Sequence, residues 1–172
     1  MACRAALNEA GCRALKIGVV SGDDVLPLMR DAANASLSEF RNLDTDKTLD
    51  DVRDRLVTAN AYLGAAPIVE ALAGGADIVI TGRVADPSLT VAPCIHHFGW
   101  TETDWNRLAG ATVAGHLIEC GTQVTGGIST DWLDVPDAAH IGFPIVEVSD
   151  DGSCIVTKPR GTGGHVTELT VK

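Results

Sequence analysis

The chain has 172 residues, of which 45% are apolar, and its 23 acidic and 13 basic side chains give a formal net charge of −10. That acidic balance argues against a nucleic-acid partner, because phosphate binding needs clustered Lys and Arg. No run approaches the roughly 18 apolar residues of a membrane helix, and residues 1–11 lack the apolar stretch of a secretory signal. We therefore expect one ordinary cytoplasmic domain with no membrane partner.

The first 33 residues predict a helix, a strand and a second helix. Residues 5–15 have a helical pattern, and the apolar run at 15–20 predicts a strand that ends in the turn at 21–24. Residues 24–33 then predict a helix that starts at the aspartate pair, since carboxylate oxygens accept hydrogen bonds from free backbone N–H groups.

Residues 44–82 predict two more helices and another strand. After a polar connection at 44–48, apolar residues from Leu49 to Leu63 recur near helical spacing and predict an amphipathic helix. A second helix follows through residues 64–72 and stops at a glycine pair, and residues 76–82 form an apolar strand. Two apolar strands joined through helices favour parallel pairing, which places residues 21–24 and 82–88 on the same sheet edge.

The last third predicts a helix and a β-hairpin. Residues 109–120 are rich in small side chains and predict a close-packed helix before a loop at 122–129. Two alternating runs, 144–148 and 153–157, surround an Asp-Gly turn and predict the hairpin. The sequence therefore indicates an α/β fold with a mixed, largely parallel sheet flanked by helices. Residues 1–172 are expected to form part of a single domain that is truncated at both ends.

The strongest candidate site is the loop at 81–88. It carries Arg83, Asp86 and Ser88 from a strand end to a helix start, and Asp23 lies in the neighbouring loop. The planar guanidinium of Arg83 can bind a carboxylate or phosphate, and a helix start adds backbone donors. An internal pair of Arg83 with Asp86 that fixes the turn is an equally good interpretation.

A second candidate is the glycine-rich loop at 158–164. Its glycines allow backbone N–H groups to approach an anion, while Lys158 and Arg160 supply charge. The residues expected to bind a ligand there are Arg160, Gly161, Thr162, Gly163 and Gly164. The spacing matches neither a P-loop nor a dinucleotide fingerprint, so it identifies no cofactor, and a tight structural loop is the favoured alternative.

A third candidate combines one helix with the loop that follows it. His116 and Glu119 are three residues apart and can share a helix face as a base and its orienting partner, next to Gly126 and Gly127. Structural hydrogen bonding and half of a metal site are the alternatives. The cluster at residues 94–97 has no second ligand pair, so we expect no metal.

Several segments together resemble the N-terminal domain of the acyclic terpene utilisation (AtuA-like) family. They are ANAYLGA at 59–65, GADIVITGRVAD at 75–86, GHLIECG at 115–121, TGG at 125–127, IGFPIVEV at 141–148 and GTGGHV at 161–166. The resemblance covers most of the chain and implies a role in the breakdown of acyclic terpenes and related branched acyl-CoA compounds. It also implies a domain that is longer at both ends.

Two functions fit these observations. In the first, the chain is an enzyme of a lyase or hydratase type that binds an anionic small molecule such as an acyl-CoA. Arg83 and Arg160 contact the anion, and Asp86 or Glu119 transfers a proton. In the second, the chain is a non-catalytic scaffold of an acyl-CoA enzyme, with a partner subunit or a second copy bound to it.

Overall fold

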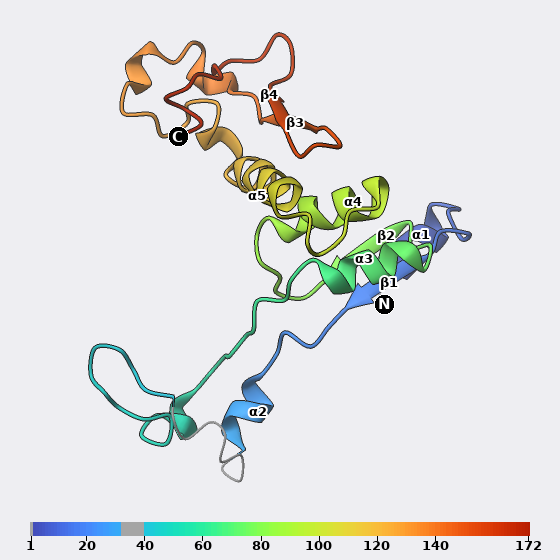
Figure 1. Cartoon of the computed structure of the whole chain (residues 1–172), viewed down its shortest axis with the longest axis vertical. Helices are drawn as coiled ribbons and strands as arrows, with labels where there is room; N and C mark the ends of the chain where they lie inside the picture. The colour runs from blue at the N-terminus through green and yellow to red at the C-terminus, as the bar shows by residue number, and fades with distance from the viewer. Residues whose placement is uncertain (1, 32–39) are drawn as a thin grey trace.

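A computed structural model describes residues 2–31 and 40–172 of the protein. Figure 1 shows a body built from two small sheets and a stack of helices, with an arm that projects from it. The arm consists of the described residues 25–31 and 40–59. Its two connections to the body pair briefly, because Asp24 and Asn60 form an antiparallel bridge.

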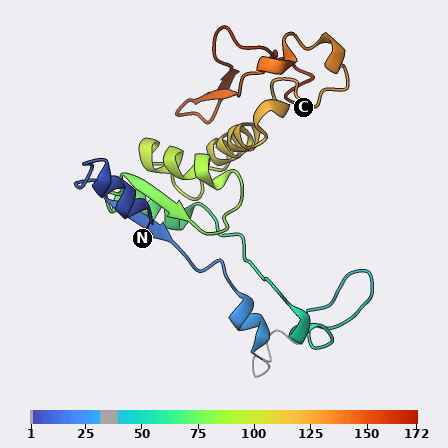
Figure 2. The same ribbon diagram turned by 180° about the vertical axis from the view of Figure 1, so that it is seen from behind.

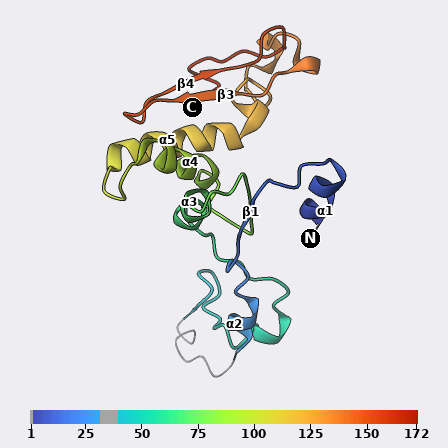
Figure 3. The same ribbon diagram turned by 90° about the vertical axis from the view of Figure 1, so that its right-hand side faces the viewer.

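The first sheet pairs β1 (Ile17–Val20) with β2 (Ile78–Thr81) in parallel, and Val20 lies opposite Thr81. The connection includes α3 (Ala66–Ala73), which has Pro67 in its first turn and ends at Gly74. In Figure 3, α1 (Ala2–Glu9) and α3 flank β1 on opposite sides. The predicted parallel pair and the glycine stop are confirmed, and both strands end at the same edge of the sheet.

Two long helices extend the body beyond α3. Helix α4 (Ser88–Phe98) packs between α3 and α5 (Trp105–Glu119), as Figure 3 shows. One apolar cluster joins Val20, Ile68, Val84 and Ala92, and a second joins Val91, Cys94, Trp100 and Ala111. Both clusters include residues of α4, so this helix links the part of the core beside the sheet to the part beside α5.

The hairpin of β3 (Ile145–Val148) and β4 (Cys154–Thr157) packs on α5. Three single-turn helices, η3 (Gly121–Gln123), η4 (Trp132–Asp134) and η5 (Ala138–His140), lead from α5 to it. The indole N–H of Trp100 donates to Asp150 in the hairpin turn at 3.1 Å. The predicted hairpin is confirmed. Figure 2 shows the hairpin and the single-turn helices from behind.

The α/β class is confirmed, although the four described strands form two separate two-stranded sheets rather than one continuous sheet. Two helix predictions need adjustment at their ends. Helix α1 ends at Glu9 and is followed by Gly11 with a φ of 74°, while α2 (Leu26–Arg30) is shorter than predicted. Residues 32 and 33 of that predicted helix lie outside the described residues.

The predicted amphipathic helix at 49–63 is wrong. Only η2 (Arg53–Arg55) forms a single helical turn there. Leu49 is instead buried within the arm, and Leu63 forms a parallel bridge with Val84 beside the sheet. The apolar residues that share a helical spacing therefore serve two different parts of the molecule. None of the described helices has both the length and the apolar character needed to cross a membrane.

Candidate functional site

Asp23 holds together the segments that meet at the end of the parallel sheet. Its Oδ2 accepts hydrogen bonds from the backbone N–H of Arg83 at 2.7 Å and from the side-chain amide of Asn60 at 3.1 Å. The Arg83 hydrogen bond, more than any other contact, lowers the pKa of Asp23 below its usual value. The carboxylate therefore stays ionised. It fastens the loop after β1 (residues 21–24) to the loop after β2 (residues 82–87) and to the returning segment, residues 60–62, which follows the arm.

The side chain of Arg83 remains available to a ligand. Its guanidinium lies over the ring of Tyr62, with Cζ 5.5 Å from the ring centroid. Among residues 2–31 and 40–172, no ion pair joins it to Asp86, so the internal pair considered from the sequence is not formed. Stacking on an aromatic ring orients a guanidinium without neutralising its charge.

A cavity of about 480 Å³ opens at these strand ends. Its lining comes from the loop after β1, the returning segment, the end of β2 and the loop after it, the start of α4 and the end of α5. The residues are Asp23, Asn60, Thr81, Gly82, Arg83, Val84, Asp86, Leu89 and Glu119. Four of the residues predicted as site residues, Asp23, Arg83, Asp86 and Glu119, are thus brought together around one space.

Asp86 and Glu119 face this cavity without partners of their own. Both are exposed, and neither accepts a hydrogen bond or forms an ion pair within the part of the chain that the structure describes. The two come from different elements, since Asp86 precedes α4 and Glu119 is the last residue of α5. A carboxylate that no other group engages can accept a proton from a bound molecule.

Two other predicted residues lie close by but outside the lining. Ser88 is 5% exposed at the first position of α4. His116 is exposed on α5, and the described contacts include no hydrogen bond between its side chain and Glu119. Across the described residues, no group of three or more His, Cys, Asp and Glu side chains is arranged to hold a metal ion.

The glycine-rich loop at 158–164 contributes no residue to the lining of this cavity. The ammonium of Lys158 donates to the carbonyl of Thr162 at 2.6 Å, within the loop itself. Gly163 and Gly164 are buried, and an added Cβ on either would overlap backbone atoms of Asp137 or Thr125. These contacts favour the tight structural loop, and the anion-binding role of Arg160, Gly161 and Thr162 stays a prediction.

The glycines of the loop after α5 are also used in close packing. Gly126 has a φ of 103° and lies against Val135, while a Cβ on Gly127 would come within 2.8 Å of the Thr122 carbonyl oxygen. Neither glycine lines the strand-end cavity. Their predicted part in ligand binding is therefore separate from the convergence of Arg83, Asp86 and Glu119.

A comparison with protein families identifies the chain. The family model described as acyclic terpene utilisation family protein AtuA matches residues 1–172. The chain belongs to this family. Searches among curated proteins and among solved structures gave no significant match. The family resemblance that the short segments indicated is thereby confirmed, and the AtuA match extends over residues 1–172.

Sequence reasoning missed part of the cavity of this AtuA family member. Asn60 lines the cavity and Tyr62 lies under the Arg83 guanidinium, and both stand just after the arm in a segment that had been assigned to a helix. Leu89, another lining residue, lies in the first turn of α4. Asn60 and Tyr62 stand in the segment 59–65 that carries the family resemblance. The sequence contained a signal for them, but it did not show that this segment would return beside the strand ends.

Proposed function

We propose that the chain is an enzyme, or a component of an enzyme, in the breakdown of acyclic terpenes and branched acyl-CoA compounds. It binds an anionic small molecule in the strand-end cavity. The observation that supports this most is the convergence of Arg83 with the unengaged carboxylates of Asp86 and Glu119 in one space. Membership of the AtuA family supports the metabolic setting.

The lining residues suggest a division of roles. Arg83 binds a carboxylate of the ligand, whose paired oxygens suit its fork of donors, or donates to the single oxygen of the thioester carbonyl. The positive end of the α4 dipole adds to the attraction. Asp86 or Glu119 takes up or delivers a proton beside that carbonyl, as hydration, dehydration or proton abstraction requires. Asp23 is engaged in holding the loops, so its contribution is to position Arg83.

The setting of this activity follows from charge and cysteine chemistry. We place it in the cytoplasm, because the five free cysteines fit a reducing compartment. The net charge of −10 favours a small-molecule partner over nucleic acid.

The test uses purified protein and a set of branched and terpenoid acyl-CoA compounds. We expect turnover that falls at least about a hundredfold in Asp86→Asn or Glu119→Gln, whichever carries the proton transfer. Arg83→Ala is expected to weaken ligand binding. Glu9→Gln is the matched control, because Glu9 is an exposed carboxylate at the end of α1. Absence of turnover, together with ligand binding that is unchanged in Arg83→Ala, contradicts the proposal.

A second candidate function is a non-catalytic subunit of an acyl-CoA enzyme. The chain exposes 11371 Å², whereas a compact monomer of 17.9 kDa exposes about 8,000 Å². Several large apolar side chains are among the exposed ones, including Leu43, Ile128 and Trp132. That excess would suit a second copy or a partner subunit. A complex whose partner keeps full activity when Asp86 and Glu119 are both substituted supports this function over the first.

A further inference from the structure

The arm contains a cavity of its own, remote in the chain from the proton-transfer residues. It measures about 280 Å³ and is lined by Phe40, Arg41, Asn42, Thr45, Lys47, Thr48, Leu49, Val52 and Arg55. Three of these side chains are cationic, and none is a carboxylate. The only charged side chains on this lining are therefore cations, although the chain as a whole has a net charge of −10.

The cavity has a defined backbone frame. Arg41 and Thr48 form an antiparallel bridge, and the backbone N–H of Asn42 donates to the carbonyl of Lys47 at 2.8 Å. The Asn42 side chain then accepts from the backbone N–H of Thr45 at 2.9 Å. Leu49, which also lines the cavity, is only 6% exposed. The lining residues are therefore presented by a hydrogen-bonded loop with an apolar floor.

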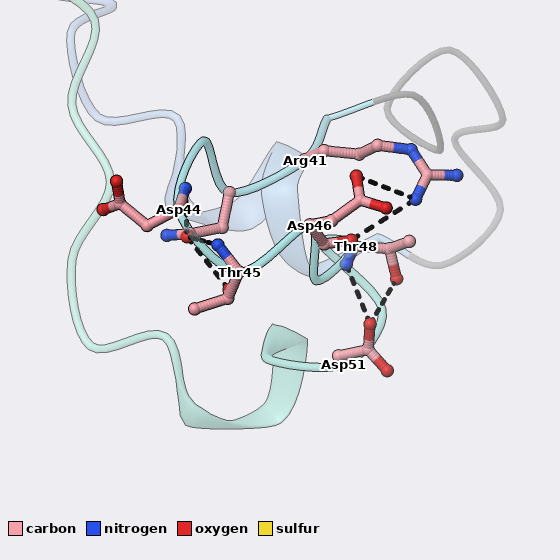
Figure 4. Close-up of polar contacts among 7 residues, drawn as sticks. Arg41, Asp44, Thr45, Asp46, Thr48 and Asp51 are labelled. Atoms are coloured by element: carbon pink, nitrogen blue, oxygen red, sulfur yellow. Dashed lines mark hydrogen bonds and ion pairs between the residues drawn. The ribbon is translucent and has the colours of Figure 1, made fainter.

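Two nearby carboxylates, those of Asp51 and Asp46, are engaged in contacts within the same loop (Figure 4). Asp51 accepts hydrogen bonds from the backbone N–H and the hydroxyl of Thr48, at 2.8 and 2.9 Å, and these bonds lower its pKa more than the charges of Lys47 and Arg41 do. Asp46 pairs with Arg41 at 3.4 Å, but both side chains are more than half exposed. Arg41 also donates to the carbonyl of Asp46 at 3.3 Å. Exposed pairs of this kind contribute little to stability, so a ligand anion can replace the Asp46 carboxylate at Arg41.

The other two cations have no such partner. The side chains of Lys47 and Arg55 form no hydrogen bond and no ion pair with any residue that the structure describes. Arg53, on the same turn, shows the contrast, because its guanidinium binds Asp50 and the carbonyl of Met29. Arg53 therefore serves the fold of the arm, while Lys47 and Arg55 bring positive charge to the cavity without such a role.

We propose that this arm cavity binds a phosphate group. A phosphate dianion matches the charge of Lys47 and Arg55, and its several oxygens can accept hydrogen bonds from both and from Arg41. Phe40 is 56% exposed on the same lining and offers an apolar surface to the organic part of a phosphate monoester. The site stands apart from the proposed strand-end function and does not depend on it.

The test begins with the unmodified full chain. Amide resonances are followed by NMR during titration with inorganic phosphate and, separately, with phenyl phosphate. We expect saturable shifts centred on Asn42, Thr45 and Thr48, with phenyl phosphate binding more tightly if a monoester is the ligand. Equal affinity for the two probes assigns the site to free phosphate. Either result supports the proposal, and this measurement needs no variant to fold.

Variants then identify the groups that bind. Lys47→Gln and Arg55→Gln are each expected to weaken phosphate binding about tenfold, the effect of losing one charge-assisted hydrogen bond. Lys47→Arg keeps the charge and is expected to retain binding. Lys16→Gln and Arg13→Gln are the matched controls, since both are exposed cations outside the arm.

Two results overturn the proposal. One is the absence of saturable binding, or a loss of binding that is as large in the control variants as in the arm variants. The other is self-association of the chain that disappears in Lys47→Gln and Arg55→Gln without any phosphate effect, which assigns the basic lining to an acidic protein surface.

Discussion

A single methyl group at Gly115 tests whether the packing of α5 positions the strand-end cavity. Gly115 is buried on α5, and a Cβ there would lie 2.8 Å from both Cα and the carbonyl oxygen of Pro87. Pro87 stands directly between Asp86 and the first residue of α4. The substitution Gly115→Ala therefore presses on the backbone of the loop that carries Asp86.

The magnitude follows from two opposing effects. In a free helix, Ala at this position is favoured over Gly by about 1 kcal/mol. Carbon contacts are normally about 3.5 Å or longer, so the backbones of α5 and the Pro87 loop must separate by roughly 0.7 Å. Overpacking of this kind costs about 1–3 kcal/mol, and the neighbouring Ala111 and Ala114 are fully buried, which limits relaxation. We expect a net loss of up to about 2 kcal/mol.

Urea denaturation of the purified chain measures this loss, and amide shifts near Asp86 report the displacement of the loop. Gly64→Ala is the control, because nothing lies within 4 Å of a Cβ at that position. That control should leave stability unchanged or raise it by about 0.4–1 kcal/mol. If Gly115→Ala stabilises the chain as it would a free helix, the close approach of α5 to Pro87 is not present in solution and the reasoning fails.

Three further predictions concern the same framework. Gly110→Ala should loosen the hairpin from α5, because the added methyl would overlap the hairpin turn; a loss of amide protection in β3 and β4 under hydrogen exchange is the expected result, and unchanged protection contradicts it. Acid should release the Arg83 amide from Asp23: the folded pKa of Asp23 is lowered, so its contribution is complete above about pH 4 and disappears as pH falls through the folded pKa. An Arg83 amide shift that titrates near neutral pH contradicts that assignment. Asp150→Ala should alter the fluorescence of the buried Trp100 by removing its indole acceptor, whereas an unchanged spectrum argues against this hydrogen bond.

The sequence predicted those parts of the fold whose signals are local. Such signals specify a structure through backbone preference or side-chain burial over a few residues. They are the glycine pair after α3, the apolar runs of β1 and β2, and the Asp-Gly turn of the hairpin. Parallel pairing then placed Asp23 and Arg83 at one sheet edge by topology alone. The sequence alone was therefore enough to predict that these two residues lie at the same end of the sheet.

The structure of the arm could not be predicted in the same way. Leu49 and Leu63 share a helical spacing, but one is buried within the arm and the other pairs beside Val84 in the body. The spacing of apolar residues is the same whether they form one face of a helix or are buried in two separate parts of the molecule. The basic lining was hidden as well, since Arg55 would have belonged to the solvated face of the predicted helix and Lys47 stood in a polar connection.

The described contacts also separate the three carboxylates of the strand-end cavity by role. Asp23 accepts hydrogen bonds from the Arg83 amide and from Asn60, so its charge holds the loop after β2 and the returning segment in place. Removing it would move Arg83 and the arm together, and a loss of activity would not distinguish chemistry from positioning. Asp86 and Glu119 carry no such structural duty among the described contacts. The proposed proton transfer is therefore assigned to one of those two. Because they lie on different elements, the distance between their carboxylates depends on how closely α5 approaches the start of α4.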